Sequence, residues 1–259
     1  MMSEVCERIQ DEFSVSVIDE AQAKARYLLD DHPFREIHSE RQINEILPHY
    51  LAMSQAFPYI QAGSQANAIL AAIKSNHEVP RSLEITSVVG NFLSWDETGG
   101  AYVMDRYGKS GLSKILDTEK WFHANLLKAD IEKLTGKPVS PEFGDPTGSY
   151  LTNLFEGLAS LSAVTRCAYM VSFEMHANTM ISALWDAVSS SYGVDRTQLK
   201  YFECHVGGND PAEAYHVAMT RQMVDLLVRH EDEAQFVSDS LKAMQENIDW
   251  CAALTEFSK

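Results

Sequence analysis

Cysteine is sparse in this sequence, and its few copies lie far apart. The four cysteines, Cys6, Cys167, Cys204 and Cys251, form no Cys-x-x-Cys pair. Disulfide frameworks and zinc ribbons both need regularly spaced cysteines, so neither is predicted. The N-terminal residues also lack a basic segment followed by an apolar run, which is the pattern of a secretory leader. These absences predict a reduced, cytoplasmic protein.

Basic residues are also in the minority. The chain has 21 Lys and Arg against 37 Asp and Glu, which gives a formal net charge of -16. Binding to nucleic acid or to an anionic membrane requires clustered cations that neutralise phosphates. No stretch approaches 18 uncharged apolar residues, the length from which a membrane span is predicted. We therefore expect no nucleic-acid partner and no membrane partner.

Several common catalytic signatures are missing as well. The sequence has no G-x-G-x-x-G loop, no Walker motif and no G-x-S-x-G nucleophile elbow. Dinucleotide binding, phosphate-loop chemistry and serine hydrolysis are thereby disfavoured. Among the cysteines, only Cys204 has an obvious activating neighbour, His205.

Helical periodicity dominates what is present. Apolar residues recur at spacings of three and four in nearly every segment, and the one strand-like run is LEITSVVG at 83–90. Proline and glycine breaks leave predicted helices near residues 17–30, 39–57, 64–76, 81–96, 111–135, 148–190, 195–205, 211–230 and 232–257. The 259 residues are predicted to form a single all-α domain. The helix at 148–190 is long enough that we expect it to kink or split.

One group of candidate ligands surrounds a Gly-Gly break in the last third of the chain. Glu213 and His216 are three residues apart and share a helix face, a spacing by which bundle helices hold non-haem iron. His205 lies just before the break. Asp210 fits a helix N-cap, Pro211 the first helical position, and Glu213 the third position of a capping box. Helix capping by Asp210, a solvent-exposed helix face and a contact of His205 with the helix dipole would explain the same pattern without a metal. A metal site and these structural roles therefore both stay open.

Glu174 stands in an otherwise apolar stretch, VSFEMHANT. A buried, unpaired carboxylate is costly, so Glu174 is either exposed, protonated or compensated by a cation such as a metal. Glu156 lies 18 residues earlier, five helical turns away, and is a rival carboxylate if the helix is straight. His176 points to another face and is expected to be structural or exposed.

A third segment combines Glu97, in NFLSWDETGG, with His123, in WFHANLLKAD. His123 lies on a helix rich in apolar residues. A core histidine and a metal ligand fit this setting equally well.

These segments together resemble the haem-oxygenase-like diiron oxidases. This superfamily includes the chlamydial death-domain-associated protein and an alkene-forming fatty-acid decarboxylase. The resemblance rests on NFLSWDETGG, HANLLKADIEKLTGKP, FEMHANT and YFECH, and HPFREIHSERQINEILPHYLAMSQAFPYIQAG is similar to the first helices of the family. It covers most of residues 30–230.

The resemblance implies a haem-oxygenase-like helical bundle that binds two Fe(II) ions and uses dioxygen as a co-substrate. Its implied metal ligands are Glu97, His123, Glu174, His205, Glu213 and His216, with Asp210 as the alternative to Glu213. Glu174 would bridge the irons and is the implied catalytic residue. Glu97, His123 and His205 would serve one iron, and Glu213 and His216 the other.

Two spacings depart from the family pattern. Glu97 and His123 are 26 residues apart, which implies an insertion around residues 99–118. His205 and His216 are separated by four extra residues, so the acid of the last motif falls on Glu213 or on Asp210. These departures concern the second iron site more than the fold.

The expected function is oxidation of a small metabolite, with an amino acid or amino-acid-derived amine as the implied substrate, by N-oxygenation or oxidative C-C cleavage. Oxidative decarboxylation of a fatty acid is the alternative within the same fold. An external electron donor and a homodimer are compatible with this interpretation. The rivals are a metal-free, thiaminase-type (TenA-like) or cofactor-biosynthesis (PqqC-like) enzyme and a helical interaction protein. Haem binding would need His32 or His38 as the proximal ligand.

Overall fold

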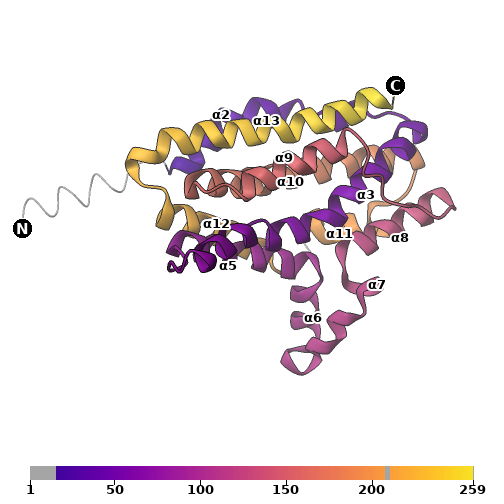
Figure 1. The fold of residues 1–259 in the computed structure, drawn as a ribbon. Coiled ribbons are helices and arrows are strands. Elements are labelled where there is room, and N and C mark those ends of the chain that lie inside the picture. Colours follow the sequence, from indigo (N-terminus) through magenta and orange to yellow (C-terminus); the bar gives the residue numbers. More distant parts are fainter. Residues whose placement is uncertain (1–15, 208–210, 259) are drawn as a thin grey trace, which may run out of the picture.

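The structure, a computed structural model, describes residues 16–207 and 211–258, except for the side chains of residues 213 and 214. Its regular elements are all helical, which confirms the predicted fold class (Figure 1). In chain order they are α2 Val17–Asp30, η1 Pro33–Glu36, α3 Glu40–Gly63, α4 Ala66–Lys74, α5 Arg81–Glu97, α6 Gly100–Tyr107, η2 Lys109–Leu116, α7 Thr118–Trp121, α8 His123–Thr135, α9 Thr147–Leu158, α10 Ala163–Tyr192, η3 Arg196–Gln198, α11 Lys200–Val206, α12 Glu213–Leu227, η4 His230–Asp232 and α13 Glu233–Phe257.

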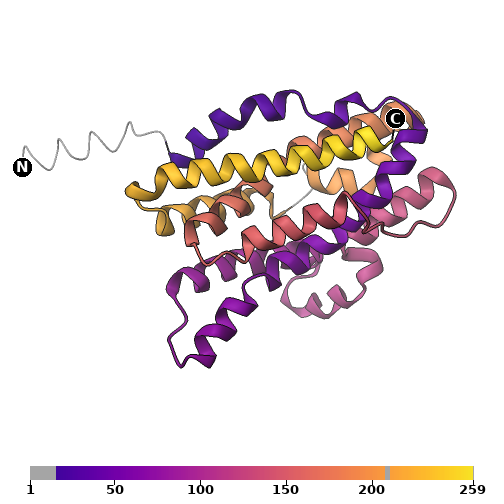
Figure 2. The same ribbon diagram turned by 45° about the horizontal axis from the view of Figure 1, so that its top comes forward.

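The long helix α10 is the centre of the bundle. Its sequence is apolar around most of its circumference, which is the pattern of a helix buried on several sides. It packs against α13 and α9, and also against α3, α5, α11 and α12. Figures 1 and 2 show α2 and α13 forming a layer on one side of α10, with α3, α5 and α12 on the other. No helix in the described ranges is long and apolar enough to cross a bilayer.

The helix bounds follow the predicted periodicity at both ends of the chain and differ from it at several places between them. The predicted helix at 111–135 is wrong, because η2, α7 and α8 replace it. The predicted helix at 148–190 does split, into α9 and α10. The break expected at Pro58 is absent, since α3 continues through it to Gly63. Pro58 has no N–H, so the carbonyl of Ser54 lacks its helical partner at this point.

The start of α12 also differs from the prediction. The helix begins at Glu213 with Ala212 in the N-cap position, and the side chain of Ala212 itself makes no capping hydrogen bond. Pro211 therefore precedes the helix instead of opening it, and the predicted N-cap Asp210 lies outside the described residues.

The segment predicted as an insertion, residues 99–118, forms a helical excursion made mainly of α6 and η2. Figure 1 shows it projecting from the body of the bundle together with α7. Gly99 has a φ of +89°, in the left-handed region that favours glycine. A Cβ at this position would lie 2.4 Å from the carbonyl oxygen of Trp121, so the base of the excursion is tightly packed.

Candidate metal centre

The C-terminal turn of α5 supplies the first acidic side chains of the site. The buried stripe of α5 runs through Leu83, Thr86, Val89, Leu93 and Asp96, at spacings of three and four. Asp96 extends this stripe and is completely buried. Glu97, the last residue of the helix, turns about 100° further round and faces a neighbouring set of helices.

Glu97 lies between two histidines from different helices. Its Oε2 atom is 3.3 Å from Nδ1 of His123, the first residue of α8, and its Oε1 atom is 3.6 Å from Nε2 of His205 on α11. The two imidazole rings meet edge to face, with centroids 4.7 Å apart. We call Glu97, His123 and His205 the Glu97 group. The structure thus brings together three residues of which the first and last, Glu97 and His205, are more than 100 positions apart in the sequence.

His216 of α12 lies between two other carboxylates. Its Nδ1 atom is 3.4 Å from Oε2 of Glu174 on α10, and its Nε2 atom is 3.0 Å from Oδ2 of Asp96. We call His216, Glu174 and Asp96 the His216 group. Because Asp96 and Glu97 are consecutive, the end of α5 connects the two groups.

The second ring nitrogen of each histidine also lies near a polar atom. For His216 this atom is Oδ2 of Asp96, as described above. His205 Nδ1 donates to the backbone carbonyl of Tyr201 at 2.8 Å, which leaves the lone pair of a neutral ring on Nε2, toward Glu97. His123 Nε2 lies 3.6 Å from the sulfur of Cys204. Metal-bound histidines characteristically hold their outer nitrogen in this way, which fixes the tautomer and the ring orientation.

The electrostatics show that these groups attract positive charge. Burial opposes a charged ring, but Asp96 and Glu174 together raise the pKa of His216 to about 11. Burial likewise opposes the charge on His123, yet Cys204 and Glu97 raise its pKa to about 10. Burial would raise the pKa of Glu97, and His123 and His205 hold it well below its usual value. A site that concentrates negative charge on imidazoles can accept metal cations in place of the ring protons.

The residues present therefore fit a metal. Nδ1 of His123 is buried and makes no hydrogen bond, although Glu97 is 3.3 Å away. An imidazole nitrogen that faces a carboxylate is stabilised by a cation between the two atoms, which can be a ring proton or a metal ion. The sulfur of Cys204 lies within 4.8 Å of ligand nitrogens of His123 and His205, so it is a further donor atom at the edge of the Glu97 group.

A cavity of about 50 Å³ opens beside the two groups, lined by Glu97, Glu174, His205 and His216. This is room for a few water molecules. Much of the remaining lining is apolar, and its Phe57 and Phe173 rings stack at a centroid distance of 3.9 Å. The polar part of the wall includes Tyr50 and Tyr201, whose hydroxyls are 3.2 Å apart.

Five of the six predicted ligands thus converge, and the sixth is partly undescribed. Glu213 begins α12, but its side chain lies outside the described residues, as does the whole of Asp210. Glu156 is wrong as a rival carboxylate, because α9 ends at Leu158 and leaves Glu156 exposed.

Asp96 is the carboxylate that the sequence interpretation missed. Its position on the buried stripe of α5, three residues after Leu93, was the available signal. Cys204 was noticed as a possible nucleophile, whereas the structure places its thiol against His123. Tyr201 was not singled out, although it lies four residues before His205 on α11, where its carbonyl accepts from His205 Nδ1 and its ring contacts the imidazole.

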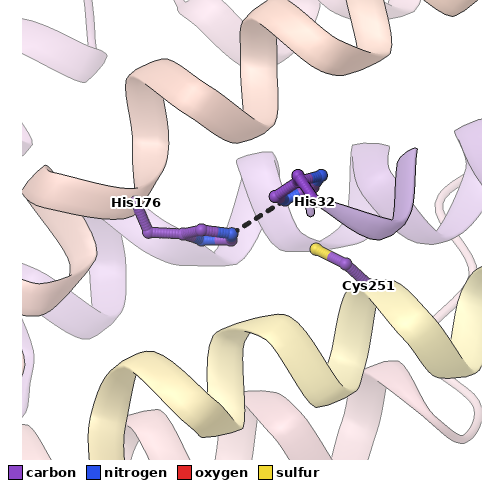
Figure 3. Close-up of side chains that lie close together, drawn as sticks. All are labelled: His32, His176 and Cys251. Carbon is purple, nitrogen blue, oxygen red and sulfur yellow. Dashed lines mark hydrogen bonds between the residues drawn. The ribbon is translucent and has the colours of Figure 1, made fainter. Parts of the chain in front are cut away.

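A second buried cluster, His32, His176 and Cys251, has a different chemistry (Figure 3). His32 Nδ1 accepts a hydrogen bond from the backbone N–H of Phe34 at 3.2 Å. A neutral His32 must therefore carry its proton on Nε2, which faces His176 Nε2 at 3.0 Å. The two rings therefore form a buried hydrogen-bonded pair. His176 was expected to be structural or exposed, and its burial makes the second alternative wrong. His32, one of the two histidines that haem binding would need, forms this buried pair with His176.

No known family model and no curated protein matches the sequence. Among solved structures, the fold matches the crystal structure of a CADD-like protein of unknown function from Nostoc punctiforme. The TM-score is 0.65 at 16% sequence identity, over 93% of this chain and 98% of that one. The chain is therefore an all-α bundle with the fold of a CADD-like protein.

Proposed function

We propose that the protein is a non-haem diiron oxidase or oxygenase of the haem-oxygenase-like superfamily, which uses O2 to oxidise a small metabolite. The observation that carries this proposal is the convergence of three histidines on three carboxylates near the end of α5, with a polar atom within 3.6 Å of both ring nitrogens of each histidine. Mixed imidazole and carboxylate ligands with open positions suit ferrous iron. The fold shared with a CADD-like protein supports the same class.

The proposed substrate is an amino acid or an amine derived from one. Bound iron would supply the activation of O2. The chain's own contribution is an apolar cavity wall that excludes water and a small space that limits substrate size. Small-molecule sites usually have about 300 Å³ or more, so side chains must move for either substrate, and a long alkyl chain requires the larger movement. Met53 and Met180 line the wall, and their flexible side chains can yield to a small substrate.

The two tyrosines offer a route for a proton at the cavity wall. The hydroxyls of Tyr50 and Tyr201 form a hydrogen bond, and the Tyr201 ring lies against His205 at a centroid distance of 4.3 Å. This pair can hold a proton near substrate and pass it between the two oxygens. An external electron donor is part of the proposal for reactions in which the substrate supplies only two electrons to O2.

Anaerobic loading with Fe(II) tests the proposal. We expect about two irons per chain in the wild type, by elemental analysis, and an O2-dependent change in visible absorption. His123→Ala and His216→Ala should each lower the iron content, whereas His230→Ala is the matched control because His230 is 95% exposed. Absence of iron uptake by the wild type would support a metal-free enzyme or an interaction protein instead.

A pair of substitutions determines which acid completes the ligand set. Glu213→Gln removes a charge with little change in size, and we expect it to reduce the iron content toward one per chain. Asp210→Asn should leave the iron content unchanged. The reverse result would transfer the ligand role from Glu213 to Asp210.

A further inference from the structure

A second and larger cavity, of about 470 Å³, is lined in part by Cys204, whose sulfur contacts His123. Tyr102 and Arg106 of α6 line one side of it, and Lys200 and Cys204 of α11 another. Figure 1 shows α6 and α7 projecting from the bundle next to α8 and α11. Its volume is in the range of small-molecule sites, unlike the 50 Å³ beside the candidate ligands.

The charge of this cavity is opposite to that of the whole protein. Arg106, Lys120 and Lys200 line it, with Glu203 as its one carboxylate. None of the three cations forms an ion pair with a described residue. Several arginines elsewhere do pair with carboxylates, namely Arg26, Arg41, Arg196, Arg221 and Arg229. In a chain of net charge -16, three such cations at one cavity form a local anion-attracting field.

The remaining lining suits a flat, apolar body. Trp121 is buried to 7% exposure, and Lys120 Nζ lies 4.8 Å from its ring centroid. Tyr102 and Leu126 add a second aromatic ring and an aliphatic side chain. Apolar walls with a few placed charges are the usual composition of a small-molecule site.

We infer that this cavity binds a small molecule with an aromatic or apolar body and an anionic group, a carboxylate or a phosphate. The cations attract and orient the anion, and Trp121 and Tyr102 contact the body. The two cavities share no lining residue, although Cys204 of this one also contacts His123. Binding here therefore does not depend on the proposed metal chemistry.

Isothermal titration calorimetry on the metal-free, full-length protein tests this inference. The probes are benzoate, phenyl phosphate and the uncharged benzamide. We expect the anions to bind about tenfold more tightly than benzamide, and more weakly as salt is raised. The stronger of the two anions identifies the preferred group.

The Lys120→Gln/Lys200→Gln double variant should bind the anions about tenfold more weakly. The matched control, Lys24→Gln/Lys74→Gln, removes the same charge from α2 and α4 and should bind as the wild type does. Three results would overturn the inference: benzamide binding as tightly as benzoate, equal weakening in the control, or no heat from either anion at millimolar concentration.

Discussion

At the scale of single residues, the candidate centre depends on the groups behind the histidines. An imidazole presents a lone pair to a metal only if its other nitrogen is held in place. His205 has a backbone carbonyl for this, and His216 has the buried carboxylate of Asp96. A carboxylate also raises the basicity of the ring, so Asp96 should strengthen His216 as a ligand while remaining behind it.

Asp96→Asn tests this role. Asparagine keeps the size of the side chain and an acceptor oxygen, but removes the charge. We expect iron affinity at the His216 group to fall about 10- to 100-fold, with the Glu97 group unaffected. Competition with a chelator measures the two affinities. Asp105→Asn, at an exposed position of α6, is the control. Equal weakening at both groups would show general damage instead of a role behind His216.

The buried pair of His32 and His176 makes stability depend on pH. Burial first, and then the charge of Arg35, lower the pKa of His32 from 6.5 to about 4. The groups that face it are His176, whose pKa burial also lowers, and Cys251, whose pKa burial raises. The folded protein therefore keeps His32 neutral, whereas the unfolded chain takes up a proton below pH 6.5.

The contribution of neutral His32 to the free energy of unfolding is therefore fully present above pH 6.5. This contribution, about 3 kcal/mol, is lost as the pH falls from 6.5 toward about 4. Chemical denaturation at a series of pH values measures the slope. His32→Asn should reduce the slope in this range but not abolish it, since asparagine does not titrate and can still cap η1, whereas His176 keeps its own contribution. The exposed His38→Asn should leave the slope as it is in the wild type.

At the scale of helices, glycine allows neighbouring helices to pack closely in the core. Gly157 of α9 lies against Tyr169 of α10, and an added Cβ would be 2.2 Å from the Tyr169 ring. Only glycine lets the two helices approach this closely without moving the ring. The hydroxyl of Tyr169 donates a hydrogen bond to Oε2 of Glu246 on α13 at 2.9 Å, so the ring cannot move freely.

Gly157→Ala should therefore destabilise the fold by about 1–3 kcal/mol, the usual cost of overpacking. Gly63→Ala is a matched control at the end of α3, because no atom lies within 4 Å of its added Cβ. There we expect a small gain of about 0.5–1 kcal/mol from the better helix propensity of alanine. Thermal unfolding followed by circular dichroism compares the two. A neutral Gly157→Ala would mean that α9 can shift away from α10.

Local sequence predicted the outer helices more accurately than the site region. The bounds of α2 and α13 follow directly from apolar spacing and from capping residues such as Ser16. The break between α7 and α8 could not be read in this way, since Phe122 takes an extended ψ of 121° inside a periodic stretch. Its ring is buried in the core, so tertiary packing outweighs local preference.

For the candidate site, the chemistry of residues was predictable and their pairing was not. Unusual polar residues in apolar segments, Glu174 and His123, indicated the site from sequence. Which nitrogen faces which carboxylate depends on helix orientation. Asp96 was missed because its neighbour Glu97 matched the first glutamate of the family pattern. The role of these residues as iron ligands stays a prediction.

At the scale of the whole molecule, the candidate ligands come from five helices, α5, α8, α10, α11 and α12. These helices are distant in sequence, and their buried polar groups interrupt an otherwise apolar bundle. Without metal, imidazolium rings partly balance the carboxylates. Metal ions would replace those protons and join the five helices through bonds that are absent from the unfolded chain.

Iron binding should therefore stabilise the entire fold. A ligand present at 100 times its dissociation constant adds about 2.7 kcal/mol, and for a chain of this size each kcal/mol raises Tm by about 2–4 °C. We expect Fe(II), added anaerobically, to raise Tm by about 5–10 °C in the wild type. Magnesium should raise it much less, because Mg²⁺ prefers oxygen ligands and three histidines face this site. The His123→Ala/His216→Ala variant should show no Tm shift with iron. If that variant shifts as much as the wild type, iron stabilises the protein from another position, and the convergence of these five helices has a structural cause alone.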